Sequence, residues 1–331
     1  MNRFVLTISV LVAVSALTAC GADTVRTEGR EALSGATSYP LTVENCGTEV
    51  TFDRAPERIL LTGSAQVPYL DDLGVVDRII SRAGVFPEGY FSDELQQQVE
   101  SVPLLTDRVD ASGHLKISSE TIIDEEPDLL LGIPDGVDRA VLKSAGINAI
   151  DEPAMCNESS EKPNPSFEKI YERMRFYGEI FDRNDEAQAA VEALQADVAA
   201  ALEGLPDLKG QTVAVLWPEA GAGTFYAYGR QSMSFVQTEA LGLTNVYDDV
   251  DERVFESTLE ALLGRDPDIL VLLYDGRDPQ VPLDAIEQIP GANDLAAVRE
   301  GRIMTQLFNF SEPPTPLSIE GLHKIAEFVV Q

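Results

Sequence analysis

Histidine, tryptophan and cysteine are scarce in this sequence of 331 residues, which has two histidines, one tryptophan and three cysteines. The histidines, His114 and His323, lie far apart along the chain. They argue against a binder of bare zinc or manganese, because such sites usually need several histidine ligands. The sequence also lacks a phosphate-binding loop, a nucleophile elbow and an H-E-x-x-H motif. Catalysis therefore has little support from motifs.

Basic residues are also in short supply, with 24 lysines and arginines against 56 acidic residues and a formal net charge of −32. This balance argues against nucleic-acid binding and against direct adhesion to anionic lipid. A solvated acidic surface accounts for it more simply than an acidic partner-binding face does. The 44% of hydrophobic residues is enough for a folded chain with one large core or two smaller ones.

Long apolar runs are missing except at the N-terminus, "MNRFVLTISVLVAVSALTAC". One basic residue, Arg3, precedes an apolar run that is too short to span a bilayer comfortably, so residues 1–19 are predicted to be an export signal. The segment "LTAC" resembles the bacterial lipobox, which implies that Cys20 is lipidated rather than buried or redox-active. Acyl chains on one residue hold a protein at a membrane. Residues 20–39 are predicted to be the lipidated cysteine and a flexible tether.

Two cysteines remain, Cys46 and Cys156. In an exported protein they are expected to be paired rather than free. Such a bridge would stabilise the first half of the chain by about 4 kcal/mol in the chain-entropy model.

One short stretch of sequence occurs twice. "SETIIDEEPDLLL" at residues 119–131 matches "LEALLGRDPDILV" at residues 259–271, and their prolines lie 140 residues apart. That spacing suits one small α/β domain rather than a solenoid repeat. Short apolar runs alternate with helix-like stretches in both halves, which is typical of a parallel sheet with helices on its faces. We therefore predict α/β lobes at residues 40–163 and 205–331.

Residues 164–204 separate the two lobes and have apolar residues at helical spacing. They predict one long helix, or two helices joined near Asn184. A helix of about 20 residues spans about 30 Å, the width of a small domain. This region is therefore a candidate bridge between the lobes.

The order of these features resembles the substrate-binding lipoproteins of ABC importers for ferric siderophores, haem and vitamin B12. Within that family, called class III periplasmic binding proteins, the actinobacterial iron-siderophore binders are most similar. The lipobox, the "NCG" turn, "TEVTFDRAPERILL", the repeated segments and the bridging region carry the resemblance. It implies an α/β fold of two Rossmann-like lobes, bridged by a single long α-helix, with a ligand cleft between them. It also implies a monomer that is not an enzyme and has no cofactor beyond the iron of the bound complex.

The resemblance gives the repeat a functional interpretation. Glu120 and Glu260 each lie seven residues before the repeated proline, where the family has glutamates that dock onto arginines of the membrane permease. The alternative is structural, because Ser257 and Glu260 match an S-x-x-E capping box and an acidic residue in a first helical turn gains from the helix dipole.

Ligand-binding candidates come from the ends of the predicted strands, since ligands collect at the carboxyl ends of strands in such sheets. Arginines there suit the oxygens of catecholate, hydroxamate or carboxylate chelates, and aromatic rings suit the organic body of the ligand. Surface salt bridges and core aromatics are the alternative for any one of them. The candidates are Arg82, Trp217, Tyr226, Arg230, Tyr274 and Arg277.

We therefore predict a cell-surface lipoprotein that captures a ferric siderophore and delivers it to the ABC permease. Haem or a corrinoid is the alternative ligand. A two-lobed chelatase-like enzyme is the alternative class and would need a proton-handling group in the cleft. His114 lies in a loop that either borders the cleft or is simply solvated.

Overall fold

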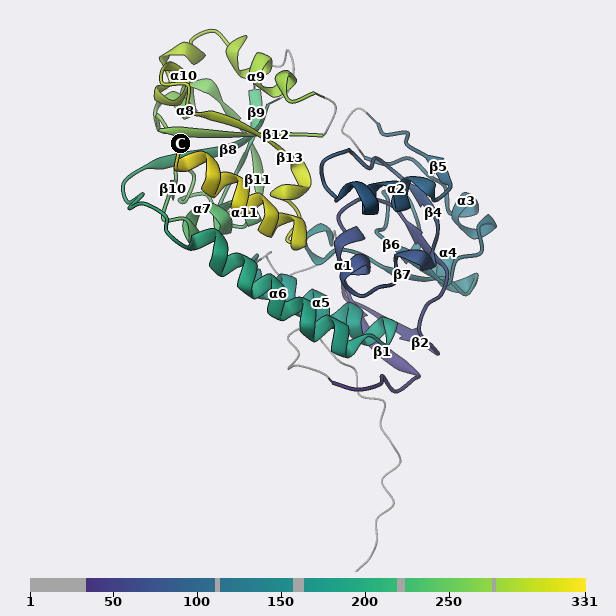
Figure 1. Cartoon of the computed structure of the whole chain (residues 1–331). Helices are drawn as coiled ribbons and strands as arrows, with labels where there is room; N and C mark the ends of the chain where they lie inside the picture. The colour runs from purple at the N-terminus through teal and green to yellow at the C-terminus, as the bar shows by residue number, and fades with distance from the viewer. Residues whose placement is uncertain (1–33, 111–113, 157–163, 219–223, 276–277) are drawn as a thin grey trace, which may run out of the picture.

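The computed structural model describes residues 34–110, 114–156, 164–218, 224–275 and 278–331, which form two α/β lobes joined by a pair of helices (Figure 1). Cys20 and the segments predicted as export signal and tether lie outside the described residues, apart from residues 34–39. The predicted two-lobed α/β fold is confirmed.

The N-terminal lobe is built on five parallel strands in the order β5 (Leu104–Thr106), β4 (Ile79–Ala83), β3 (Ile59–Leu61), β6 (Leu129–Leu131) and β7 (Asn148–Ile150). Strands β3 and β6 are short apolar segments buried at every residue, as expected for a parallel sheet covered on both faces. An antiparallel hairpin of β1 (Leu41–Asn45) and β2 (Thr48–Phe52) precedes the sheet. The helices of this lobe are α1 (Val67–Asp72), α2 (Asp93–Ser101), α3 (Ser119–Asp124) and α4 (Arg139–Ser144), with 3₁₀ turns at Val76–Arg78 and Pro153–Met155.

The C-terminal lobe has a mixed sheet in the order β11 (Val254–Thr258), β9 (Thr224–Tyr228), β8 (Thr212–Pro218), β12 (Ile269–Tyr274) and β13 (Ile303–Leu307). Strand β10 (Thr244–Asn245) pairs with the start of β8. Strands β8, β12 and β13 are parallel, whereas β9 is antiparallel to both of its neighbours. The helices are α7 (Met233–Ala240), α8 (Leu259–Leu263), α9 (Gln280–Glu287), α10 (Ala296–Arg299) and α11 (Pro316–Val329), with 3₁₀ turns at Ala292–Asp294 and Phe308–Phe310.

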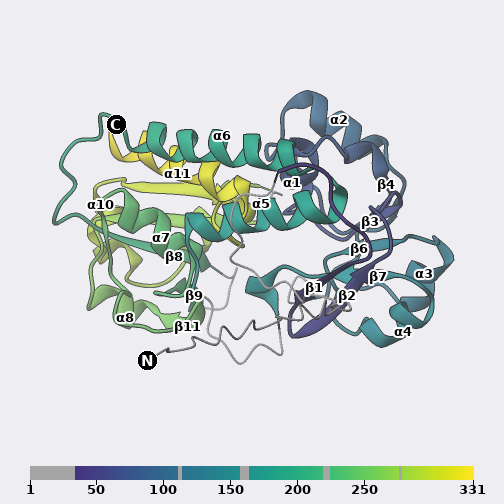
Figure 2. The same ribbon diagram turned by 90° about the horizontal axis from the view of Figure 1, so that it is seen from below.

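Two helices, α5 (Phe167–Phe181) and α6 (Asn184–Leu202), occupy the predicted bridging region and lie side by side in Figure 2. Helix α5 ends at Phe181 and is followed by the capping residue Asp182, whose φ of 55° is left-handed. Of the two predicted arrangements, the structure has two helices joined near Asn184. Helix α6 spans both lobes, because its first half packs in the N-terminal core and Ala201, near its end, packs in the C-terminal core; Phe167, at the start of α5, also packs against both cores.

The repeated segments form equivalent parts of the two lobes, α3 leading to β6 and α8 leading to β12. In each, the aspartate after the proline accepts hydrogen bonds where the neighbouring central strand begins. Asp128 accepts from the backbone N–H of Arg58 at 2.9 Å, next to β3. Asp268 accepts from the backbone N–H of Thr212 at 2.8 Å, at the start of β8. The Pro-Asp part of the repeat is therefore structural.

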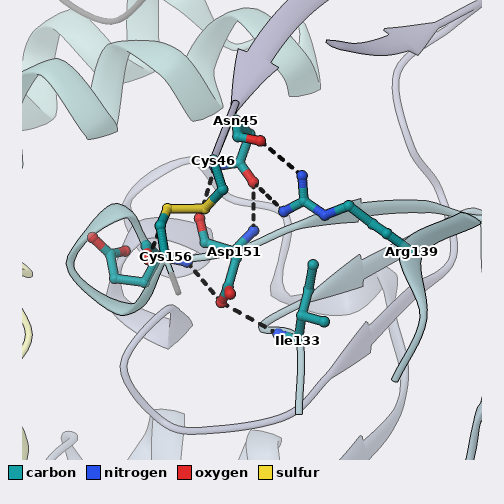
Figure 3. The surroundings of a disulfide bond; sticks show 7 residues. Asn45, Cys46, Ile133, Arg139, Asp151 and Cys156 are labelled. Carbon is teal, nitrogen blue, oxygen red and sulfur yellow. Dashed lines mark hydrogen bonds between the residues drawn. A yellow bond between two sulfur atoms is a disulfide. The ribbon is translucent and has the colours of Figure 1, made fainter. Parts of the chain in front are cut away.

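The predicted disulfide is confirmed: Cys46 and Cys156 are bonded, with their Cα atoms 5.4 Å apart (Figure 3). It joins the tip of the β1–β2 hairpin to the chain just after β7. Beside it, the Arg139 guanidinium donates to the backbone oxygen and the side-chain oxygen of Asn45, each at 2.7 Å. The side chain of Asn45 also exchanges two hydrogen bonds of 2.8 Å with the backbone of Asp151. The hairpin tip is thus fixed to the carboxyl end of β7.

The two lobes share apolar packing next to the bridge. The core cluster of the N-terminal lobe includes Met233 from α7 and Ile319 from α11, both of which belong to the C-terminal lobe. Helix α11 also packs against α6 and α1. The lobes are therefore joined by buried contacts as well as by the chain itself.

Candidate functional site

The carboxyl ends of the two sheets meet where the lobes approach each other. The segment after β4 contacts the segment after β13: the backbone N–H of Asn309 donates to the hydroxyl oxygen of Tyr90 at 2.9 Å. Ser64, which follows β3, donates to the side-chain oxygen of Asn309 at 2.9 Å. This is the edge of both sheets where ligands bind in folds of this type.

Three aromatic side chains lie together on the C-terminal side of this edge. Trp217 near the end of β8 is directly opposite Tyr226 on β9, which places both on the same face of the sheet. Phe308 meets the Trp217 ring edge-on, with ring centroids 5.4 Å apart. Tyr226 keeps 39% of its surface exposed. We call Trp217, Tyr226 and Phe308 the aromatic platform.

Tyr274 ends β12 and pairs with Leu307 at the end of β13. Its ring joins an apolar cluster of Tyr90, Leu307, Phe310 and Leu317. Partial burial, and then the negative charge of Asp278, raise the pKa of Tyr274. The phenol is therefore protonated at neutral pH and available as a hydrogen-bond donor.

Arg82 lies near the end of β4 as predicted, but its guanidinium points toward the end of α2. Its Nε atom donates to the backbone oxygen of Val102 at 3.1 Å, and its terminal nitrogen donates to that of Glu100 at 3.4 Å. It also stacks over Phe86, 5.1 Å from the ring centroid. These contacts stabilise the C-terminal end of a helix, where a cation is favoured.

Arg230 is not brought together with the aromatic platform. We expected it at a carboxyl edge because it follows a strand, and that premise is wrong because β9 is antiparallel to β8. The chain leaves the carboxyl edge along β9, and Arg230 donates to the backbone oxygen of Asp248 on the loop below. Arg277 lies outside the described residues.

His114 contacts Asp135, with Nδ1 and a carboxylate oxygen 2.6 Å apart. Asp135 belongs to the turn after β6, so the pair ties the loop before α3 to the carboxyl edge of the sheet. The two side chains are 59% and 49% exposed. The histidine is thus well solvated, in line with the simpler of its two interpretations.

Glu120 and Glu260 occupy the same position in two short helices. Ser118 caps α3 and Thr258 caps α8, which makes each glutamate the second helical residue. The hydroxyl of Ser118, and then the backbone amide of Glu120 itself, lower the pKa of Glu120. Both glutamates are exposed. In Figures 1 and 2, α3 and α8 lie on opposite flanks of the molecule, away from α6.

The predicted capping box of Ser257 and Glu260 is wrong. Thr258 is the capping residue, and its hydroxyl accepts from the backbone N–H of Ala261 at 3.3 Å. The Ser257 hydroxyl is instead buried against the hydroxyl of Tyr247 at 3.2 Å. Because Ser257 and Thr258 adjoin, sequence alone did not identify which of them caps the helix.

A groove of about 320 Å³ lies elsewhere, between α6 and α11, and is lined by residues that include Leu194, Ile319 and His323. It is on the bridge side of the molecule and shares no lining residue with the aromatic platform. Among the described residues, no cluster of three or more histidine, cysteine or carboxylate side chains is arranged to hold a metal ion. Within the same residues, every helix is too short or too polar to cross a bilayer.

A family model for periplasmic binding proteins matches residues 59–306. The chain belongs to this family. Membership of this family makes the chain an extracytoplasmic binding protein and not an enzyme. A comparison with curated proteins finds no match.

Solved structures agree with the family assignment. A structure described as an ABC-type Fe3+-hydroxamate transport system from Saccharomonospora viridis is 47% identical, covers 89% of this chain and 100% of its own, and has a TM-score of 0.82. A periplasmic binding protein from Veillonella parvula is 21% identical, covers 87% and 96%, and has a TM-score of 0.72. The haem-binding protein RhuT from Roseiflexus is 19% identical, covers 82% and 97%, and has a TM-score of 0.64. The last two show the fold alone.

Sequence reasoning missed Tyr90 and Ser64, which connect this site to the other lobe. Tyr90 lies in "FPEGYFSDE", where neither a strand end nor a repeat marks it. Asn309 was recognisable as a strand-end residue, but its partners come from more than 200 residues away. A contact of that kind has no local sequence signal.

Proposed function

We propose that this binding protein captures a ferric hydroxamate siderophore and presents it to an ABC permease. The observation that carries the proposal is the 47% identity, over 89% of this chain, to the Saccharomonospora Fe3+-hydroxamate transport protein. The haem-binding relatives are only 16–19% identical and support the fold rather than the ligand.

The charges at the candidate site favour the same ligand class. A ferric hydroxamate carries no net negative charge, whereas a ferric tricatecholate is a polyanion. The chain is strongly acidic, and the two predicted arginines that are described, Arg82 and Arg230, are hydrogen-bonded to backbone oxygens away from the aromatic platform. A polyanion would meet repulsion from this acidic chain, and neither of these two arginines directs its guanidinium to the platform to offset it. The platform suits an apolar ligand body that bears neutral or positive charge.

Fluorescence of Trp217 tests the ligand class, because Trp217 is the only tryptophan and lies in the platform. We expect ferric desferrioxamine B, a hydroxamate complex that absorbs near the tryptophan emission, to quench it saturably. A ferric tricatecholate and haemin should bind at least tenfold more weakly. Tight binding of either one, with no response to the hydroxamate, would overturn the proposed ligand class.

Variants separate the platform from the rest of the surface. Tyr226→Ala should lower the affinity for the ferric hydroxamate about tenfold, which corresponds to about 1.4 kcal/mol of binding free energy. Val281→Ala, an exposed apolar residue on α9, should leave it unchanged. Arg230→Ala should also leave it unchanged, since β9 carries Arg230 away from the carboxyl edge.

Membrane attachment through lipid on Cys20 is a second part of the proposal. The lipobox-like "LTAC" supports it, as does the need of a capture protein to stay near its permease. Intact-mass analysis of membrane-extracted protein should show an N-terminus at Cys20 with added acyl mass. An intact peptide bond between Ala19 and Cys20 in the mature protein would rule the anchor out.

Permease docking by Glu120 and Glu260 is the third part. Its support is their shared position, as exposed second residues of the equivalent helices α3 and α8. Two carboxylates on opposite flanks of one molecule suit a partner with two matching cationic sites.

A further inference from the structure

Three polar groups at the meeting of the two lobes converge on one residue, Asn309. Its backbone N–H donates to the Tyr90 hydroxyl, its side-chain oxygen accepts from Ser64, and its side-chain nitrogen donates to the backbone oxygen of Glu312 at 2.8 Å. Tyr90 and Ser64 belong to the N-terminal lobe, and Glu312 belongs to the C-terminal lobe. Two of these three bonds therefore run between the lobes.

The N-terminal partners of these hydrogen bonds are buried, and Asn309 is half-buried. Tyr90 is 7% exposed and Ser64 is 4% exposed. The Tyr90 ring meets Phe310 edge-on, with centroids 5.1 Å apart, and Leu307 joins the same cluster. Burial is the main cause that raises the pKa of Tyr90, so its hydroxyl stays protonated. Leaving a buried partner of such a bond without its hydrogen bond lowers the stability of the folded state.

The C-terminal side of this contact is rigidly held. Glu312 is fully buried and accepts from the backbone N–H of Met233, at the start of α7, at 2.6 Å. It also pairs with Arg253 at 3.4 Å. The Gln237 side chain donates to the backbone oxygen of Phe310 at 2.6 Å. The segment from Leu307 to Thr315 is thus anchored in its own lobe and meets the other lobe as a fixed surface.

The same short turn also carries a platform residue. Phe308, which packs on Trp217, is adjacent to Asn309, which bonds to the N-terminal lobe. A shift of one lobe relative to the other would move this turn, and with it the aromatic surface that the ligand contacts.

We propose that Ser64, Tyr90 and Asn309 form an interlobe latch, which holds the lobes at a preset separation and positions the aromatic platform before ligand arrives. Tyr90 and Ser64 are positioning residues that act through Asn309. The link to ligand capture rests on the proposed function, whereas the latch itself does not.

Hydrogen exchange measured by mass spectrometry on the full chain without ligand tests the latch. Tyr90→Phe removes only the hydroxyl and keeps the ring in its cluster. It should speed amide exchange at least tenfold in peptides covering residues 84–92 and 307–317, and leave the β1–β2 hairpin at residues 41–52 unchanged. Ser64→Ala should act on the same peptides. Because both bonds end on Asn309, the two changes should not act independently. The acceleration of amide exchange in the double variant should be smaller than the product of the accelerations in the two single variants.

Tyr39→Phe is the matched control. The Tyr39 hydroxyl donates to the backbone oxygen of Ile180 at 2.7 Å, and this bond joins the N-terminal lobe to α5 rather than lobe to lobe. We expect this variant to leave exchange at residues 307–317 at the wild-type rate. Wild-type exchange there in Tyr90→Phe and Ser64→Ala would overturn the latch.

Dissociation of ferric desferrioxamine B, followed by Trp217 emission, tests the positioning role. Tyr90→Phe should release the ligand about tenfold faster, and Tyr39→Phe should release it at the wild-type rate. Faster exchange with unchanged release would overturn positioning of the platform. If wild-type protein binds no ferric complex, the proposed ligand class fails, and the exchange experiment still decides the latch.

Discussion

At the scale of single residues, the buried carboxyl of Glu312 links stability to pH. Burial raises its pKa from 4.5 to about 7, although Arg253 and the backbone N–H groups of Met233 and Ser234 act in the opposite direction. The folded protein therefore favours the protonated form. The stabilisation that comes from protonating Glu312 is fully present below pH 4.5 and is lost as pH rises through about 7.

Glu312→Gln should remove this pH dependence, because glutamine is neutral at every pH and has nearly the same shape. The free energy of unfolding of the wild type, relative to the variant, should fall by on the order of 3 kcal/mol across that window. Urea unfolding at several pH values between about 4 and 8 measures it. For Glu320→Gln, a change at an exposed residue of α11, the free energy of unfolding should follow the same pH dependence as that of the wild type. Parallel curves for Glu312→Gln would show that the carboxyl does not titrate in this range.

Single residues also mark the limit of sequence reasoning at the site. The pairing of Cys46 with Cys156 was predictable because few cysteines remained after the export signal was removed. The direction in which a side chain points was not: Arg82 sits near a strand end as predicted, yet its guanidinium binds the end of α2. The sequence shows the chemical type of each residue, whereas the orientation of its side chain depends on contacts with residues that are distant in the sequence.

At the scale of elements, strand positions were predicted correctly, whereas the direction of β9 was missed. The run "FYAYGR" is apolar and short, as parallel strands of this fold are, and nothing in it shows that β9 runs antiparallel to β8. Direction depends on the length of the preceding connection, since a short link permits an antiparallel neighbour and a parallel one needs a crossover. Only residues 219–223 separate β8 from β9, so the link length was the available signal.

The two repeated segments contain the same turn before a strand. Each proline follows a residue with positive φ, Glu126 at 51° and Asp266 at 40°. Each aspartate after the proline then bonds to the start of a central strand. The repetition is thus largely explained by one turn used twice, and only the glutamates remain without a structural task beyond the first helical turn.

Close packing of α5 and α6 depends on Gly178. A Cβ there would meet the Cβ of Ala187 inside van der Waals contact and approach the backbone oxygen of Arg183 at 3.1 Å. Gly178→Ala should lower the free energy of unfolding by about 1 to 3 kcal/mol, although alanine is the better helix former by about 1 kcal/mol. Gly264→Ala, at the end of α8, meets nothing closer than 3.6 Å and should be close to neutral. Equal stability of the two variants in urea unfolding would show that the helices can move apart at little cost.

At the scale of the whole molecule, the proposed function requires two separate surfaces, one for the ligand and one for the permease. The candidate ligand site lies where the carboxyl edges of the sheets meet, and the predicted docking glutamates lie on the outer flanks, on α3 and α8 (Figure 1). Buried contacts through α6, α11 and the interlobe latch join the lobes, so the distance between the two glutamates is set by the same packing that sets the ligand site. A permease that contacts both flanks would thereby sense the separation of the lobes.

The double change Glu120→Ala, Glu260→Ala tests docking. Removing both carboxylates should abolish or sharply reduce uptake of the ferric complex while ligand affinity stays within about twofold, because the candidate site lies elsewhere on each lobe. Losing one partner of a fully desolvated interface charge pair costs about 2 to 5 kcal/mol, much of it because the other charge is left buried and unpaired. Reversing both residues to arginine should impair uptake further, since like charges would then face each other.

Glu94→Ala is the matched control, because Glu94 is also the exposed second residue of a capped helix, α2. It loses the same interaction with a helix dipole, about 0.3 to 1 kcal/mol, without touching a flank helix. Uptake, thermal stability and Trp217 titration on the same variants decide the matter: wild-type uptake by a stably folded double variant would leave the repeated glutamates with a purely local role.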